Sequence, residues 1–414
     1  MKKTLFLLVF LAGFIAAVFA GGSGDAKAGQ KSTAAAGPVK LTLILRGGTY
    51  SDVIKTMIPA FEKENNVTCE IIDLSFADLH DKIALDARNP KGAYDLLMVD
   101  GSWIPEFIEY GVVKNLSDIG YTLDSDFIKE VTVAGVNKAG KVFCVPYFGN
   151  VNVFFFNDAL LKSVNAPVPT TWNDVLETAK KIQATGKTGY LARAQAGDNI
   201  TTDFLPVLLS HGGWLFNDKG DVTINTPEFK AALEFYLKLK DAGKIMDKDD
   251  IVAAISGGNA GMGLAWPGWY VPKVDGPAHY SVIPTKVNAS SPSRPSSIYG
   301  VWFLGVAENS QNPQLAMKLL QYITNAENQI ASVKLGGVPV RHSAYKDAGV
   351  LAANPHFNIV YNALQSGVYR PLVIEWTDIT IALGNELDAA VHGVKTVSKA
   401  LADAQAAVEK IMKK

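Results

Sequence analysis

The segment from Val145 to Asn157 constrains the fold of this chain more than any other stretch. Its second half, Val151 to Phe156, reads VNVFFF and is rich in β-branched and aromatic residues. That composition over six positions predicts a short buried strand, because it is too short for a helix. Asn150 and Asn152 interrupt the apolar run. Amides in such a setting need hydrogen-bond partners, so we expect both side chains to have them.

The length and charge of the chain limit what it can be. Its 414 residues exceed one ordinary hydrophobic core and fit two lobes. The formal net charge is −1 and the sequence has no basic run, so we do not expect a nucleic-acid partner. After the N-terminal segment, no apolar run reaches the roughly 18 residues that a membrane-spanning helix needs.

Residues 1–20 have the pattern of a signal peptide. Lys2 and Lys3 precede an apolar run from Leu5 to Val18, and small residues stand before the expected cleavage point after about Ala20. Residues 21–38 are rich in Gly, Ala, Ser and Lys, which predicts a disordered tether. A membrane anchor is the alternative, but the apolar run is short. No Cys lies near Ala20, so we expect an exported, soluble periplasmic protein without a lipid anchor.

Strands and helices alternate in the first third of the chain. We expect strands at residues 40–45, 67–74 and 94–99, with helices between them, and this order implies a parallel sheet. The first strand runs into Arg46-Gly-Gly-Thr-Tyr50 and then into a helix, so a polar pocket should form at the carboxyl edge of the sheet. The turn lacks the GxxxxGK[ST] and GxGxxG patterns of nucleotide-binding loops.

The residues offer no catalytic or metal-binding constellation. The two cysteines, Cys69 and Cys144, lie in separate apolar contexts, and we expect two free thiols rather than a disulfide. No metal-ligand spacing is present, and no cofactor is expected. GxSxG and HExxH motifs are also absent from the sequence.

Several segments, in order, resemble the bacterial extracellular solute-binding proteins of the maltodextrin-binding type. The run from Val145 is similar to the strand that leads from the first lobe of that family to the second. The segments at 94–118, Pro169–Trp172, 212–220 and 336–341 are similar to further family motifs, and together the resemblance covers nearly all of residues 40–414. The Trp172 side chain of the second motif is expected in the core, and Thr171 is expected to cap its helix with Asp174.

The resemblance implies a fold and its division. The fold class is α/β, a two-lobe periplasmic-binding-protein fold of type II with three interlobe crossings. Lobe one is expected at residues 39–148 and 299–340, and lobe two at residues 149–298 and 341–414. The ligand is expected in the cleft between the lobes.

Sugars need stacking aromatic rings together with directional hydrogen-bond donors and acceptors. Arg193 interrupts an otherwise apolar strand and is expected to point into the cleft, although a solvated arginine on an edge strand is the alternative. Trp266 and Trp269 flank a Pro-Gly turn and are expected to form an aromatic wall. The complete set of expected ligand-binding residues is Tyr50, Asp100, Ser102, Trp103, Asn150, Arg193, Trp266, Trp269, Trp302, Arg341, Glu375 and Trp376.

The resemblance implies that the chain is a monomeric receptor, not an enzyme, and we expect it to capture a sugar or polyol and to deliver it to an inner-membrane ABC permease. A secreted carbohydrate hydrolase is the alternative, and it would need two carboxylates about 5–9 Å apart, such as Asp100 and Glu375. An iron or phosphate receptor is a third hypothesis. Iron receptors of this shape use adjacent tyrosines, and the sequence contains no Tyr-Tyr pair.

Overall fold

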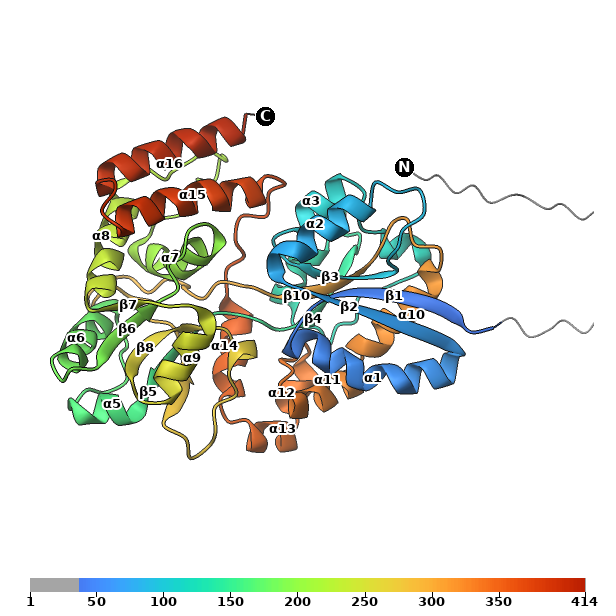
Figure 1. Ribbon diagram of the computed structural model, residues 1–414, viewed down its shortest axis with the longest axis horizontal. Helices are drawn as coiled ribbons and strands as arrows, with labels where there is room; N and C mark the ends of the chain where they lie inside the picture. Colours follow the sequence, from blue (N-terminus) through green and yellow to red (C-terminus); the bar gives the residue numbers. More distant parts are fainter. Residues whose placement is uncertain (1–36, 414) are drawn as a thin grey trace, which may run out of the picture. The chain divides into compact units, whose positions relative to one another are not determined.

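Two five-stranded sheets form the framework of the computed structural model, which describes residues 37–413 (Figure 1). The predicted signal peptide and residues 21–36 of the predicted tether lie outside the described residues. Within residues 37–413, no helix combines the length and apolarity that a bilayer crossing requires.

The first sheet has the strand order β2-β1-β3-β10-β4. Its strands are β1 (Val39–Arg46), β2 (Val67–Leu74), β3 (Leu96–Asp100), β4 (Cys144–Phe148) and β10 (Trp302–Val306). β1 is parallel to β2 and β3, as the alternation predicted, but β10 inserts antiparallel between β3 and β4. A strand from residues 302–306 therefore completes a sheet that begins near the N-terminus.

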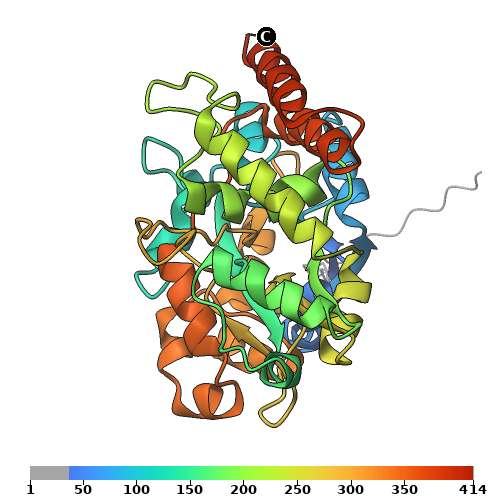
Figure 2. The same ribbon diagram turned by 90° about the vertical axis from the view of Figure 1, so that its left-hand side faces the viewer.

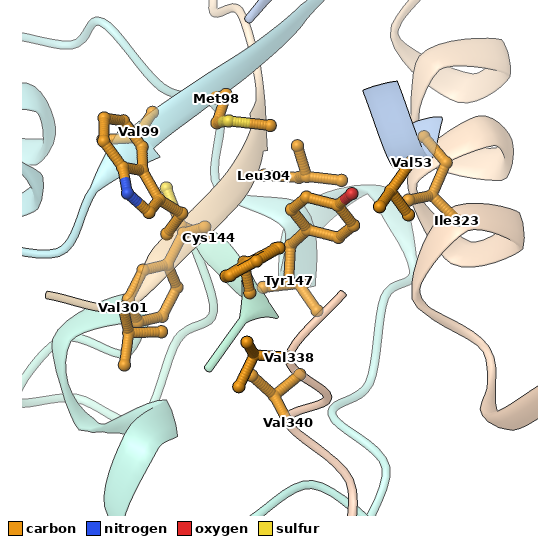
Figure 3. Packing of buried hydrophobic residues seen from close by; sticks show 14 of the residues in the cluster. Val53, Met98, Val99, Cys144, Tyr147, Val301, Leu304, Ile323, Val338 and Val340 are labelled. Atoms are coloured by element: carbon orange, nitrogen blue, oxygen red, sulfur yellow. The ribbon is translucent and has the colours of Figure 1, made fainter. Parts of the chain in front are cut away.

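Helix α1 (Thr49–Asn65) packs against the first sheet with the face that its spacing predicted, burying Val53, Ile54, Met57, Ile58 and Phe61. Figure 3 shows Tyr147 of β4 within the same core, near Val53 and Leu304. The Tyr147 hydroxyl donates to the Tyr50 carbonyl at 2.9 Å, which ties α1 to β4. The other helices in this part are α2 (Phe76–Asp86), α3 (Ile104–Glu109), α4 (Lys129–Thr132), α10 (Pro313–Thr324), α11 (Ala326–Ser332), α12 (His342–Lys346), α13 (Ala348–Ala353) and α14 (Phe357–Ser366).

The second sheet has the strand order β7-β6-β8-β5-β9. Its strands are β5 (Val153–Asn157), β6 (Thr188–Ala192), β7 (Gly243–Ile245), β8 (Ala260–Ala265) and β9 (Ala278–Ser281). The buried strand expected at 151–156 is thus β5, which starts two residues later. The start moves because residues 149–152 lie between β4 of one sheet and β5 of the other.

Helix α6 (Trp172–Gln183) confirms the predicted capping box. Thr171 accepts from the Asp174 N–H at 3.1 Å, and Asp174 accepts from the Thr171 N–H at 2.9 Å. Trp172 is buried, as expected. The other helices around the second sheet are α5 (Asp158–Ser163), α7 (Asp198–His211), α8 (Pro227–Asp241), α9 (Lys248–Ser256), α15 (Trp376–Val391) and α16 (Val397–Ile411). Figure 2 shows α15 and α16, in red, packed side by side.

The segments that join the sheets are hydrogen-bonded to one another through their backbones. The Asn152 N–H donates to the Ile298 carbonyl at 3.0 Å, and the Gly300 N–H donates to the Asn150 carbonyl at 3.0 Å. A third connecting segment is bonded to the second, because the Tyr299 N–H donates to the Val368 carbonyl at 2.9 Å. The lobe boundaries and the number of crossings stay predictions.

Both cysteines are free thiols, as expected. Cys69 lies on β2 and Cys144 on β4. Burial raises the pKa of both thiols, that of Cys69 to about 12. Both side chains therefore stay protonated at neutral pH and act as small apolar residues.

Candidate functional site

A cavity of about 420 Å³ is lined by residues associated with both sheets. From the first sheet and its helices come Arg46, Tyr50, Phe76, Asp100 and Trp302. From the second come Arg193, Asp198, Asn199, Thr202, Asp247, Lys248, Asp249, Trp266 and Trp269. Connecting segments contribute Asn150, Gly300 and Arg370.

Aromatic rings form the wall of the cavity on the side of the first sheet. Tyr50 stands in the first turn of α1, and its ring centroid lies 5.5 Å from that of Trp302, the first residue of β10. The ring centroid of Phe76 lies 6.0 Å from that of Trp302. Burial raises the pKa of Tyr50 to about 12, so its hydroxyl is neutral at physiological pH.

Asp100 and Arg370 form a buried ion pair at the centre of the site. Asp100 ends β3, and its Oδ1 accepts from the Ser102 N–H at 2.9 Å and from the Ser102 hydroxyl at 2.7 Å. The Arg370 Nη2 donates to the same oxygen. The Arg370 Nη1 lies 3.5 Å from Asp198 Oδ1 at the start of α7, so this guanidinium joins a carboxylate from each sheet's side.

Arg193 extends this network on the side of the second sheet. Its Nη2 donates to the Thr202 hydroxyl at 3.2 Å and lies 3.9 Å from Asp198 Oδ2. Its guanidinium carbon lies 5.2 Å from the Trp269 ring centroid, a cation–π geometry. Burial raises the pKa of Asp198, and the charges of Arg370 and Arg193 act in the opposite direction. β6 ends at Ala192, so Arg193 follows the strand and does not interrupt it.

Three polar groups of buried residues near the cavity have no partner among the described residues. They are the Oδ1 atoms of Asn150 and Asn152 and the Nε of Arg370. Of these residues, Asn150 and Arg370 line the cavity. All three atoms are closed to solvent, so a ligand in the cavity would reach them only after neighbouring side chains move.

Seven of the predicted site residues line the cavity: Tyr50, Asp100, Asn150, Arg193, Trp266, Trp269 and Trp302. Two more stand directly behind it. Ser102 holds the Asp100 carboxylate. Trp103 is buried, 5.8 Å from the Trp302 ring and 5.0 Å from the Phe76 ring, so it supports the aromatic wall without reaching the cavity.

Arg341, Glu375 and Trp376 do not line the cavity. Arg341 instead donates from Nη1 to Asp124 at 2.6 Å and from Nε to the Thr324 carbonyl at 2.6 Å, and its guanidinium carbon lies 3.9 Å from the Phe127 ring centroid. Glu375 occupies the N-cap position of α15. Trp376 is buried in the core around the second sheet.

Other lining residues were not predicted from the sequence: Arg46, Phe76, Asp198, Asn199, Thr202, Asp247, Lys248, Asp249, Gly300 and Arg370. The sequence could have indicated Arg46 as a lining residue, because it opens the glycine turn at the end of the first strand. No local pattern could have indicated Arg370, since its partner Asp100 is 270 positions away in the sequence. Within residues 37–413, no group of three or more His, Cys, Asp or Glu is arranged to hold a metal ion.

Comparison with known families and proteins gives a consistent picture. Residues 56–359 match the family described as bacterial extracellular solute-binding protein. The probable amino-acid ABC transporter periplasmic-binding protein y4oP of Sinorhizobium fredii is 24% identical over 389 residues, covering 91% of this chain and 90% of that protein. The maltodextrin-binding protein MdxE of Bacillus subtilis is 22% identical over 407 residues, covering 91% of each.

Solved structures share the fold. Maltose-bound T. maritima MalE3 superposes with a TM-score of 0.82 at 23% identity, covering 90% of this chain and all of that one. A solute-binding protein of Agrobacterium radiobacter in complex with ribitol has a TM-score of 0.80 at 20% identity, covering 90% of this chain and 98% of the other.

Proposed function

The chain belongs to the bacterial extracellular solute-binding protein family, and from this membership we propose that it is an exported receptor that binds a sugar or polyol. The family and the two-lobe α/β fold that the sequence resembled are thereby confirmed. In the proposed role, the protein is a periplasmic monomer that passes its ligand to the permease of an ABC importer.

The composition of the cavity is the observation that carries this proposal. Aromatic rings from both sides, Trp302 and Trp269 among them, provide flat surfaces for the C–H faces of a sugar ring. Arg193 and Asn150 line the cavity and place a charged donor and an amide group beside it for hydroxyl groups. A site that alternates apolar faces with directional polar groups suits a polyhydroxylated molecule better than an apolar one.

The related proteins support the same ligand class. Structures with this fold include one with bound maltose and one with bound ribitol. The relative from Sinorhizobium is described as a probable amino-acid transporter component, so amino acids belong in any ligand screen.

The geometry supports binding rather than hydrolysis. Asp100 is already ion-paired with Arg370, and Glu375 does not line the cavity. The two carboxylates considered for a hydrolase therefore do not face a common bond, as acid–base cleavage of a glycoside requires.

A thermal-shift screen of the mature protein against sugars, polyols and amino acids tests the proposal. A true ligand at 100 times its dissociation constant should stabilise the fold by about 2.7 kcal/mol. Recovery of an unchanged oligosaccharide after incubation would separate a receptor from a hydrolase. Stabilisation by amino acids alone, with none by any sugar or polyol, would contradict the proposed ligand class. Fractionation of the native cell should recover the protein in the periplasm.

A further inference from the structure

Arg46 is a cavity residue whose charge has no counter-charge. It is the last residue of β1 and lines the cavity. Its Nη1 donates to the carbonyls of Gly47 at 3.3 Å and Leu74 at 3.2 Å. Within residues 37–413 no carboxylate lies within 4.0 Å of its nitrogens, and its Nε and Nη2 make no hydrogen bond. That pair of nitrogens is the edge that an arginine uses to bind a carboxylate side-on.

The other two arginines of the cavity differ from Arg46 in this respect. Arg193 lies 3.9 Å from Asp198, and Arg370 contacts both Asp198 and Asp100. The cavity lining holds as many carboxylates as cationic side chains, but Asp100 and Asp198 pair with Arg370 and Arg193, so Arg46 is the arginine without a direct carboxylate partner. The remaining charged lining residues, Asp247, Lys248 and Asp249, lie at the start of α9 and are exposed to solvent.

The first turn of α1 adds a second source of positive potential next to Arg46. This helix has 17 residues and begins at Thr49, three positions after Arg46. Its N-cap is Gly48, at a φ of 84°, and no side chain caps the helix. The N–H groups of Ser51 and Asp52 already donate to the Gly48 carbonyl at 3.0 Å, and Asp52 adds a carboxylate to the turn, so the positive potential comes from the N–H groups before Ser51 and the end of the helix dipole. Tyr50, in the same turn, lines the cavity.

A separate observation points to a ligand acceptor atom in the same cavity. The Arg370 side chain is about 4% exposed, yet its Nε has no hydrogen-bond partner among the described residues. A buried guanidinium N–H left without an acceptor is costly, and because this Nε is itself closed to solvent, a ligand acceptor reaches it only when the side chains around it shift on binding.

We propose that the ligand is an acidic sugar or polyol whose anionic group, a carboxylate or phosphate, binds the Nε and Nη2 of Arg46 at the start of α1. The inference rests on the proposed function and specifies its substrate class. The hydroxylated part of the ligand then lies against Trp269 and Trp302, within reach of Arg370. Asp100 and Asp198 do not repel the anion strongly, because Arg370 and Arg193 compensate their charges.

Calorimetry with matched pairs of ligands tests the inference. Each neutral sugar or polyol is compared with its acid: glucose with glucuronate, galactose with galacturonate, ribitol with ribonate, and a hexose with its phosphate. We expect at least one acid to bind about 10- to 100-fold more tightly than its neutral partner, the range of a charge-assisted hydrogen-bonding group. The uronate and phosphate members of the panel distinguish the two kinds of anion. Neutral members that bind as tightly as their acids in every pair would overturn the inference while leaving the receptor function intact.

Variants of Arg46 add a second test on the acid that binds best. Arg46→Gln should reduce the acid-to-neutral affinity ratio to near one. Arg46→Lys should lower the ratio less, because lysine keeps the charge but lacks the two adjacent N–H groups of a guanidinium. Arg88→Gln is the matched control, since Arg88 is exposed, does not line the cavity and carries the same charge. It should leave the ratio unchanged.

The alternative role for Arg46 is to pair with Asp247 or Asp249 when the cavity closes. In that case Arg46→Gln would weaken the neutral and acidic ligands by the same factor, and the ratio would not change. That outcome overturns the inference. A panel in which no sugar or polyol of either charge binds would instead reject the proposed function, and the inference with it.

Discussion

The guanidinium of Arg193 faces the ring of Trp269, with 5.2 Å between the guanidinium carbon and the ring centroid. Neither side chain is fully buried, and both line the cavity. The pair thus presents a hydrogen-bond donor beside an aromatic face, and each residue limits the freedom of the other. Such preorganisation favours binding, because fewer rotamers are lost when a ligand arrives.

Truncation of either member of this pair should weaken ligand binding. Arg193→Ala removes a charged donor and should cost on the order of 1.5–3 kcal/mol, or about 10- to 100-fold in affinity. Trp269→Ala removes the stacking face. Calorimetry with the ligand identified by screening measures both effects. Arg294→Ala is the control, because Arg294 is exposed and does not line the cavity. Wild-type affinity in both cavity variants would show that these side chains are structural.

Arg341 should matter for stability and not for ligand affinity. Arg341→Ala removes hydrogen bonds to Asp124 and to the Thr324 carbonyl, together with the contact with Phe127. We expect a loss of about 1–3 kcal/mol in the free energy of unfolding. Urea denaturation measures this loss, and calorimetry should give an unchanged dissociation constant. A large drop in affinity with unchanged stability would place Arg341 in the binding site after all.

Asp100→Asn should destabilise the protein strongly. It leaves the buried Arg370 guanidinium with only the Asp198 carboxylate, 3.5 Å from Nη1, and breaking a buried ion pair on one side costs about 3–5 kcal/mol. Ser102→Ala is the matched variant, because it removes only the hydroxyl that bonds the same carboxylate. It should cost about 1 kcal/mol. Equal losses in the two variants, measured by urea denaturation, would argue against a dominant ion pair.

Asp203 should make stability depend on pH. This carboxylate accepts from the Tyr236 hydroxyl at 2.7 Å, and burial raises its pKa from 3.8 to about 6. The folded state therefore binds a proton more tightly than the unfolded chain does. The resulting stabilisation is complete below about pH 3.8 and is lost as the pH rises through about 6.

Asp203→Asn isolates this contribution, because asparagine resembles the protonated acid at every pH. The pKa difference corresponds to about 3 kcal/mol. Relative to the wild type, the variant should therefore gain up to about 3 kcal/mol in stability between about pH 4 and 7. Urea denaturation of both proteins across this range gives the difference. A difference that stays constant with pH would mean that Asp203 has an ordinary pKa.

Features of the fold that depend on neighbouring residues were predictable from the sequence. The capping box between Thr171 and Asp174 spans three positions, and the buried face of α1 follows helical spacing. Both depend only on local geometry. The exit of the first strand at Arg46 was also evident, because glycines follow it.

The pairing of distant segments was not predictable. Arg370 meets Asp100 only because the folded chain brings together residues 270 positions apart. Trp376 was among the expected ligand-binding residues. The repeat of Trp376, Ile379, Leu383 and Leu387 along α15 indicates a core face, and that pattern was the better guide. Arg341 was expected to bind the ligand. Its actual partners, Asp124 and the Thr324 carbonyl, lie in other segments, and no local pattern reveals that these are close.

The backbone hydrogen bonds between Asn150 and Gly300, Asn152 and Ile298, and Tyr299 and Val368 have a mechanical consequence. Strands bonded edge to edge resist sliding past one another, since sliding would break the bonds, but they bend together at little cost. We therefore expect the connecting segments to bend together as one hinge and not to slide past one another. We expect such bending to change the width of the cavity, because Trp302 and Trp269 line it from the sides of different sheets.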